Sequence, residues 1–113
     1  MIKIIILNKL RDEIYKTFKR DSLKIYSLIA ELEKNPTKGK VLGHVGSTSL
    51  RELRYNTYRI YFLIDRHKLY LFTKDQTEEL LIRFIKMSKK NDQQKTIDEI
   101  KFILNRIGEK GLE

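Results

Sequence analysis

The pattern of hydrophobic and polar positions predicts a strand and then two helices at the start of the chain. Residues Ile2–Leu7 form a continuous, mostly β-branched run, which indicates a strand buried on both faces or lying at the centre of a sheet. Apolar residues then recur at helical spacing after Asn8, the predicted N-cap of the first helix. A second helix is predicted from Asp21 or Ser22 to just before Pro36. Two consecutive amphipathic helices predict a helical hairpin that packs on the sheet.

The stretch 50–62, LRELRYNTYRIYF, alternates in a way that predicts a β-hairpin with its connection at Tyr55–Thr57. Side chains alternate faces along a strand. One face of the second strand is therefore wholly apolar and comprises Ile60, Phe62 and Ile64. The opposite face of the hairpin carries Glu52, Arg54 and Arg59, which we expect to be exposed to solvent.

Polar turns and further apolar runs follow this hairpin. They predict turns at 65–68 and 74–79 and strands at 69–73 and 80–87. Before the hairpin, the stretch 37–49 is predicted to be a loop or a short irregular strand around Val41–Leu42. It contains GHVGSTS, which superficially resembles a phosphate-binding loop. Such a loop leads into a helix, whereas this stretch leads into a strand, so we reject that interpretation.

The C-terminal part of the chain predicts a third helix, capped by Asn91 or Asp92 and ended by Gly108. Gln94 stands at capping-box spacing from Asn91, and residues 109–113 are predicted to fray. The helix has one apolar face, made by Ile97, Ile100, Ile103, Leu104 and Ile107.

Together these elements predict a single α+β domain over 1–113. We expect an antiparallel twisted sheet of four or five strands, with the N-terminal helical hairpin packed on one face and a C-terminal helix. The helices should cover one face and leave the other for a partner or substrate. Cationic side chains gather on that second face and at its strand end, namely Arg54, Arg59, Arg83, Lys86, Lys89 and Lys90.

Composition and charge narrow the class of protein. The 113 residues carry 24 Lys and Arg against 15 Asp and Glu, a net charge of +9, which favours a polyanionic partner as much as mere solubility. The absence of cysteine excludes disulfides and a thiol nucleophile, and two histidines make a histidine-rich metal site improbable. The apolar runs of this chain are too short for a signal sequence or a membrane span, so we expect a soluble cytoplasmic protein.

The order and spacing of several motifs resemble the RelE/ParE superfamily of toxins from toxin–antitoxin systems, and its RelE and HigB-like branch above all. The resemblance covers about residues 2 to 107 and rests on LEKNPTKG at 32–39, then LRELR, YRIYF and FIKMSKK. It implies a RelE-like fold and a ribosome-dependent ribonuclease that cuts mRNA by attack of a 2′-hydroxyl on the adjacent phosphate. It also implies a cognate antitoxin protein as partner, in a hetero-oligomer, and no metal or cofactor.

The resemblance assigns roles to particular residues. Arg59 matches the family's arginine at the scissile phosphate, and Arg54 matches the arginine of the preceding LR pair. Lys86 matches the first basic residue after the aromatic residue of the last strand. Glu52 stands where the best-known members have a lysine, so it is either a general base or an ion-pair partner of a neighbouring arginine. RNA binding is predicted for Arg83, Lys89, Lys90 and Tyr58, the last as a stacking platform. Arg83 could instead pair with Glu79.

Two other functions stay open at this point. The same fold in the ParE branch inhibits DNA gyrase without cutting RNA. A third possibility is a catalytically inactive member that only binds RNA, the ribosome or an antitoxin. No Tyr or His follows Tyr70, although RelE-like enzymes often keep one near the C-terminus as an acid or a stacking group, and its absence favours the inactive member.

Overall fold

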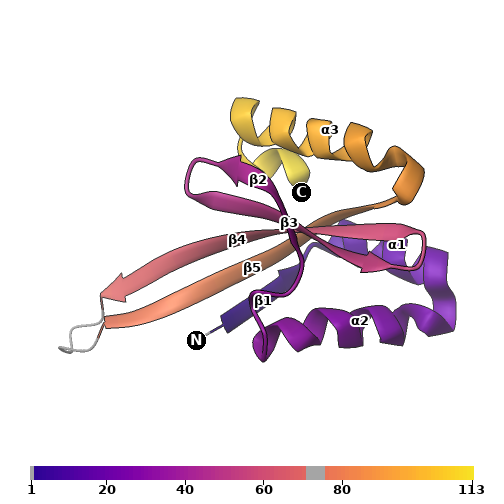
Figure 1. The fold of residues 1–113 in the computed structure, drawn as a ribbon, viewed down its shortest axis with the longest axis horizontal. Coiled ribbons are helices and arrows are strands. Elements are labelled where there is room, and N and C mark those ends of the chain that lie inside the picture. Colours follow the sequence, from indigo (N-terminus) through magenta and orange to yellow (C-terminus); the bar gives the residue numbers. More distant parts are fainter. Residues whose placement is uncertain (1, 71–75) are drawn as a thin grey trace.

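A five-stranded mixed sheet, in the order β1-β5-β4-β3-β2, organises the part of the chain that the computed structural model describes (Figure 1). That part comprises residues 2–70 and 76–113, with side chains described for 2–65 and 80–113. The strands are β1 Ile2–Ile6, β2 Lys40–Val45, β3 Thr48–Tyr55, β4 Tyr58–Tyr70 and β5 Gln76–Lys89. The helices are α1 Asn8–Phe18, α2 Ser22–Ala30 and α3 Gln93–Arg106. The α+β class is therefore confirmed.

The first strand lies at an edge of the sheet, and the prediction of a central or doubly buried position is wrong. β1 pairs in parallel with β5, from Ile2 opposite Leu80 to Ile6 opposite Phe84, whereas the other neighbouring strands are antiparallel. The sheet is thus mixed rather than wholly antiparallel. The apolar run of β1 is explained by packing against the core under the helices, since a continuous apolar run also suits an edge strand that helices cover.

The stretch 37–49 contains an irregular strand, which was one of its two predicted conformations. β2 pairs with β3 and its register shifts between Val41 and Gly43. A two-residue turn follows at Gly46–Ser47, where Gly46 has a φ of 61°, a conformation that favours glycine. The turn leads directly into β3, so GHVGSTS is a β-hairpin and lacks the strand–loop–helix geometry of a P-loop.

The turn predicted at 65–68 is wrong, because β4 continues through these residues while paired with β5. The stretch contains charged side chains but neither glycine nor proline, so nothing in its backbone chemistry ends the strand. β4 and β5 extend together well beyond the other strands (Figure 1). The end of the strand predicted at 69–73 and the start of the turn predicted at 74–79 lie outside the described residues. The rest of that predicted turn is wrong, because β5 already begins at Gln76 and pairs with β4 there.

Helices cover both faces of the sheet, so the prediction of one covered and one open face is wrong. On one face, α1 and α2 bury Leu10, Ile14, Ile25 and Ile29 against residues such as Phe62 of β4. On the other face, α3 covers a second core cluster, which comprises Leu50, Tyr61, Leu63, Ile85, Ile97, Ile100 and Leu112. Figure 1 shows α3 and α2 on opposite sides of the sheet. The second face carries too many apolar side chains to stay open to water.

The helix ends differ in detail from the predicted caps. α1 begins at Asn8 itself, and the start of α3 has no side-chain cap, so the capping box with Gln94 is not formed. The end at Gly108 is confirmed, with φ of 89° and its backbone N–H donating to the Ile103 carbonyl. The predicted fraying of 109–113 is wrong, because a 3-10 turn there buries Leu112 against the sheet.

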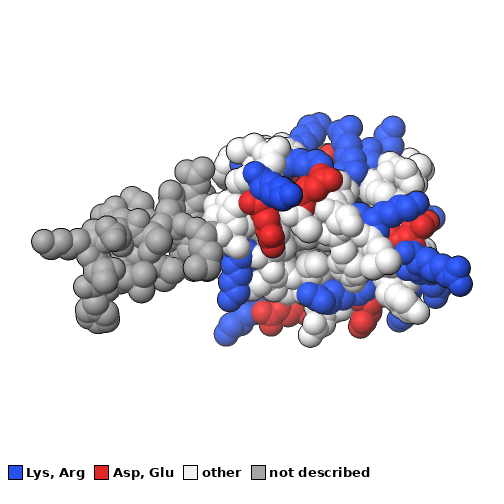
Figure 2. Space-filling model, turned by 90° about the horizontal axis from the view of Figure 1, so that it is seen from below, with Lys and Arg blue, Asp and Glu red and all other residues white. Residues whose placement is uncertain are grey.

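Lysine and arginine side chains are spread over the face that α2 covers, with acidic side chains among them (Figure 2). They are densest towards the end where Figure 1 places the β3–β4 turn and the start of α3. None of the helices in the described part of the chain is long and apolar enough to cross a membrane.

Candidate functional site

The end of the β3–β4 hairpin positions the predicted site. Asn56 and Thr57 form a two-residue turn in which Asn56 has a φ of 52°, a conformation that asparagine tolerates well. The register places Arg54 directly opposite Arg59, and Glu52 opposite Tyr61. Because side chains two residues apart share a face, the glutamate and both arginines lie on one face of the sheet, as predicted. This face is covered by α3, whereas an open face was predicted.

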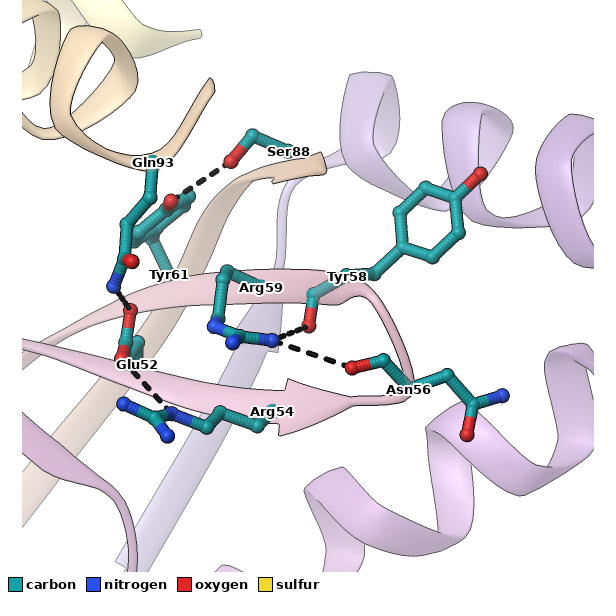
Figure 3. A network of polar contacts seen from close by, with 8 residues as sticks. All are labelled: Glu52, Arg54, Asn56, Tyr58, Arg59, Tyr61, Ser88 and Gln93. Atoms are coloured by element: carbon teal, nitrogen blue, oxygen red, sulfur yellow. Dashed lines mark hydrogen bonds and ion pairs between the residues drawn. The ribbon is translucent and has the colours of Figure 1, made fainter. Parts of the chain in front are cut away.

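Arg59 is buried, contrary to the exposed position predicted for it, with 5% of its surface accessible. Its Nη1 donates to the carbonyl oxygens of Tyr58 at 3.0 Å and Asn56 at 3.3 Å (Figure 3). Its Nε is buried without a hydrogen-bond partner. No carboxylate among the described residues forms an ion pair with this guanidinium. A buried cation without a counterion is costly, so the position needs an explanation other than stability.

Glu52 is also buried, with a fully inaccessible side chain, which again differs from the predicted exposed position. One carboxylate oxygen accepts a hydrogen bond from Arg54 Nε at 3.4 Å, and the other accepts one from Gln93 Nε2 at 2.6 Å (Figure 3). The ion-pair interpretation of Glu52 therefore describes its geometry. Gln93 is the first residue of α3, so this carboxylate also ties the helix to the sheet.

The hydrogen bond from Gln93 should contribute measurably to stability. We expect Gln93→Ala to lower the free energy of unfolding by about 1–3 kcal/mol, because it leaves one oxygen of a buried carboxylate unsatisfied. Gln94→Ala is the matched control, since Gln94 donates only to Asp98 on the exposed side of the same helix. It should cost less than about 0.5 kcal/mol. Urea unfolding of the three proteins measures the difference, and equal losses would contradict a role for the Glu52 contact.

Arg54 and Arg59 form a like-charge pair directly across the two strands. Such pairs are destabilising unless something compensates for them. The carboxylate of Glu52 pairs with Arg54 and offsets its positive charge, and the side chain of Arg54 remains 55% exposed. Arg59 receives no such compensation from the described residues. An anion placed between the two guanidiniums would be attracted by both, and phosphate oxygens fit the geometry of guanidinium donors.

A β-bulge brings Lys86 to the same face. Tyr61 pairs with Lys86 and the next residue, Phe62, pairs with Phe84, so Ile85 is an extra residue in β5. Strict alternation would have placed Lys86 on the α1–α2 face. Instead its Nζ donates to Glu99 Oε1 of α3 at 2.7 Å. This hydrogen bond, together with the positive charge of Lys86, lowers the pKa of Glu99 below its ordinary value.

The pairing of Lys86 with Glu99 predicts a pH dependence of stability. The folded-state pKa of Glu99 is lower than the ordinary 4.5, so its stabilisation is complete above that value and is lost as the pH falls through the folded pKa. Glu99→Gln should therefore be less stable than wild type at pH 7, by no more than about 1 kcal/mol because both side chains contact solvent.

The stability difference between wild type and Glu99→Gln should narrow as the pH falls below 4.5, which urea unfolding across a pH series would show. The control is Glu33→Gln, which removes the same charge from an exposed carboxylate that has no ion pair within the described structure. A difference between wild type and Glu99→Gln that stays constant down to low pH would contradict the assignment.

A polar pocket of about 480 Å³ opens beside the site, between α1, the end of β5 and the start of α3. Tyr58 and Lys89, which face each other across β4 and β5, both line it. The ring of Tyr58 packs edge-on against Phe18 with centroids 4.9 Å apart. Glu13 also lines the pocket, and burial raises the pKa of its carboxyl above the ordinary value, although Lys86 opposes this.

The other predicted RNA-binding residues lie in two places. Lys89 and Lys90 are exposed at the end of β5, and Lys90 holds the hairpin turn through a backbone hydrogen bond of 2.6 Å to Thr57. Arg83 lies farther along the sheet and forms ion pairs with Asp65 and Glu109. It therefore ties the C-terminal turn to the sheet instead of joining the arginines at the hairpin end. The side chain of Glu79, its predicted partner, lies outside the described residues.

Sequence reasoning missed several residues at this site. Gln93 contacts Glu52, and Ser88 exchanges a hydrogen bond of 2.8 Å with the hydroxyl of the buried Tyr61. Burial of Tyr61 raises the pKa of its phenol above the ordinary value. Glu13 and Glu99 were missed because their helices meet β5 only in the folded chain. The described residues contain no group of three or more His, Cys, Asp or Glu side chains that could hold a metal ion.

Comparisons with protein-family models, with curated proteins and with solved structures found no match to this chain.

Proposed function

We propose that this protein is the toxin of a type II toxin–antitoxin system, a RelE-like endoribonuclease that cuts mRNA on the ribosome. The observation that carries the proposal is Arg59, a buried guanidinium without a carboxylate partner among the described residues, placed opposite a second arginine. It agrees with the role that the RelE-like motifs assign to the arginine of YRIYF.

The proposed chemistry is attack of a ribose 2′-hydroxyl on the neighbouring phosphate, with the 5′-oxygen as leaving group. Negative charge builds up on the phosphorus-bound oxygens in the transition state, and preorganised cations stabilise it. Arg59 and Arg54 would hold the phosphate from the two strands. Lys89 and Lys90, exposed at the end of the adjacent strand, would follow the RNA backbone.

The proposed reaction moves the proton of the 2′-hydroxyl to a base and supplies a proton to the departing 5′-oxygen. Both oxygens of Glu52 accept hydrogen bonds, so it could act as a base only after Gln93 or Arg54 moves away. In the geometry described here, Glu52 orients Arg54 and keeps α3 against the sheet. We keep its role as a base as a prediction, which Glu52→Gln would test by the pH profile of cleavage.

The proposed partners are a cognate antitoxin, the ribosome and the mRNA in its decoding site. An excess of cationic side chains suits both kinds of partner, because the net charge of +9 attracts ribosomal RNA and an acidic protein segment alike. We propose that the antitoxin covers the hairpin end and forms a hetero-oligomer with the toxin, in the cytoplasm.

Inducible expression followed by primer extension on a translated message tests the proposed function. We expect growth arrest and new cleavage sites within the translated frame, both of which depend on ongoing translation. Arrest of replication with intact messages would replace the proposal with gyrase inhibition. Soluble, folded protein that causes neither arrest nor cleavage would contradict ribonuclease activity.

A catalytically inactive binding member of the same fold is the second candidate. The observation that favours it is the engagement of Glu52 on both oxygens, together with the lack of any Tyr or His after Tyr70. Such a protein would bind RNA with a steep dependence on salt concentration, and removal of each lysine would weaken binding by a similar factor.

A further inference from the structure

A second pocket, of about 430 Å³, lies away from the hairpin end on the face of the sheet that α1 and α2 share. Along β3, Arg51 and Leu53 lie on that face, since Leu53 belongs to the core cluster under α1 and α2. Glu52 and Arg54 point to the opposite face. The second pocket is thus separate from the proposed catalytic site and does not depend on the proposed function.

The polar side chains that line this pocket are three hydroxyls, one imidazole and one guanidinium. They are Thr37, His44, Ser47, Ser49 and Arg51. No acidic side chain of the described residues lines it, although acidic residues make up 15 of the 113 in the chain. A lining that combines hydroxyl donors with a guanidinium, and has no carboxylate among the described residues, is suited to an anion.

Ser49 and Arg51 are held in place by a hydrogen bond between their side chains within the pocket lining. Ser49 is 8% accessible, and its Oγ accepts a hydrogen bond from Arg51 Nε at 3.3 Å. Because the oxygen accepts from the arginine, the hydroxyl proton of Ser49 is left to donate to a third group. Arg51 uses only Nε in this contact and forms no ion pair within the described structure, so its terminal nitrogens present the fork that phosphate oxygens fit.

The remaining lining residues are apolar, and they leave room for a ligand larger than a single phosphate. Pro36, Ile64 and Leu80 contribute apolar surface beside the polar group. The volume lies within the range of small-molecule sites and exceeds what one phosphate needs. Apolar surface beside an anion site suits a nucleotide, because a charged phosphate is joined through a polar ribose to a base whose two flat faces are weakly polar.

We infer that the pocket formed by Thr37, His44, Ser47, Ser49 and Arg51 binds a nucleotide, with the phosphate held by Arg51 and the serine hydroxyls. The nucleotide is either a free mononucleotide or one unit of an RNA strand, since both present the same phosphate and base. The GHVGSTS stretch, a β-hairpin whose turn is Gly46–Ser47, supplies the hydroxyl side of the pocket.

Titration of the ¹⁵N-labelled protein with inorganic phosphate, adenosine monophosphate, uridine monophosphate and a short oligouridylate tests the inference. We expect saturable shifts of the backbone amides of 44–51, larger for the nucleotides than for phosphate alone. Arg51→Gln should weaken this binding by roughly tenfold or more, because a charge-assisted contact is lost. The matched control Arg20→Gln removes the same charge from an exposed arginine outside the pocket and should leave the affinity unchanged.

Ser47→Asp provides a second test that does not depend on how well Arg51→Gln folds. Ser47 is an exposed turn residue, so the variant should fold while placing a carboxylate in the pocket, and it should abolish the shifts. Binding of mononucleotides identifies a free nucleotide as the ligand, whereas binding of oligouridylate alone, with steep salt dependence, identifies RNA. The absence of shifts at 44–51 with every probe, or equal affinities in Arg51→Gln and Arg20→Gln, would overturn the inference.

Discussion

Arg59→Met should abolish message cleavage and yet leave the protein about as stable as the wild type, or more stable. The guanidinium of Arg59 is buried, and its Nε has no partner, so its removal eliminates a desolvated charge as well as a cation for the phosphate. Loss of one preorganised donor in a transition-state site costs roughly 100-fold or more in rate. A buried charge without a counterion is costly, and an apolar side chain of similar volume removes that cost. Primer extension and urea unfolding measure the two effects.

The control for Arg59→Met is Arg20→Met, which makes the same substitution at an exposed arginine outside the site. It should change neither cleavage nor stability by a measurable amount. If Arg59→Met unfolds, the guanidinium serves mainly to tie the carbonyls of Asn56 and Tyr58 together. If the variant folds and still cuts RNA at the wild-type rate, Arg59 does not contact the scissile phosphate.

Ile100→Ala should lower the free energy of unfolding by about 2–5 kcal/mol, a large part of what a domain of this size has. Ile100 is fully buried where α3 packs on the second face of the sheet. Truncation removes buried methyl groups and leaves a cavity that the surrounding β-sheet cannot fill by moving. Thermal and urea unfolding of the purified protein give the loss.

Ile107→Ala is the matched control, because Ile107 stands at the end of the same helix and is 66% exposed. Its truncation should change stability by no more than about 0.5 kcal/mol. Similar small losses for both variants would mean that α3 is not held against the sheet through Ile100. The pair of variants therefore tests whether α3 is held against the sheet by its buried side.

Local patterns predicted the elements of this fold better than their arrangement. The hairpin at 50–62 was predicted because alternation and turn chemistry are both contained in a few residues. The parallel pairing of β1 with β5 and the packing of α3 on the second face depend on contacts between distant segments. Ile97 and Ile100 indicated that α3 packs somewhere, but an apolar stripe does not specify which face of the sheet receives it.

At the candidate site, the sequence predicted which side chains share a face but not how deeply they are buried. Alternation correctly placed Glu52, Arg54 and Arg59 on one face, but it did not reveal that Glu52 and Arg59 are buried there. The bulge at Ile85 also changes the face of Lys86, and a bulge of this kind has no marker in the sequence, since Ile85 is an ordinary strand residue. Only the three-dimensional pairing shows where alternation is interrupted.

The parallel pairing of β1 also has a consequence for how the chain folds. Ile2 pairs with Leu80, so most of the chain separates the two residues. Loop closure over such a distance is slow, and among the described strands of this sheet β1 is synthesised before the others and β5 after them. We expect the sheet to be completed only after β5 emerges, so that β1 joins late. Exposed apolar residues of β1 would then make the nascent protein vulnerable to aggregation and proteolysis until synthesis of the strands is complete.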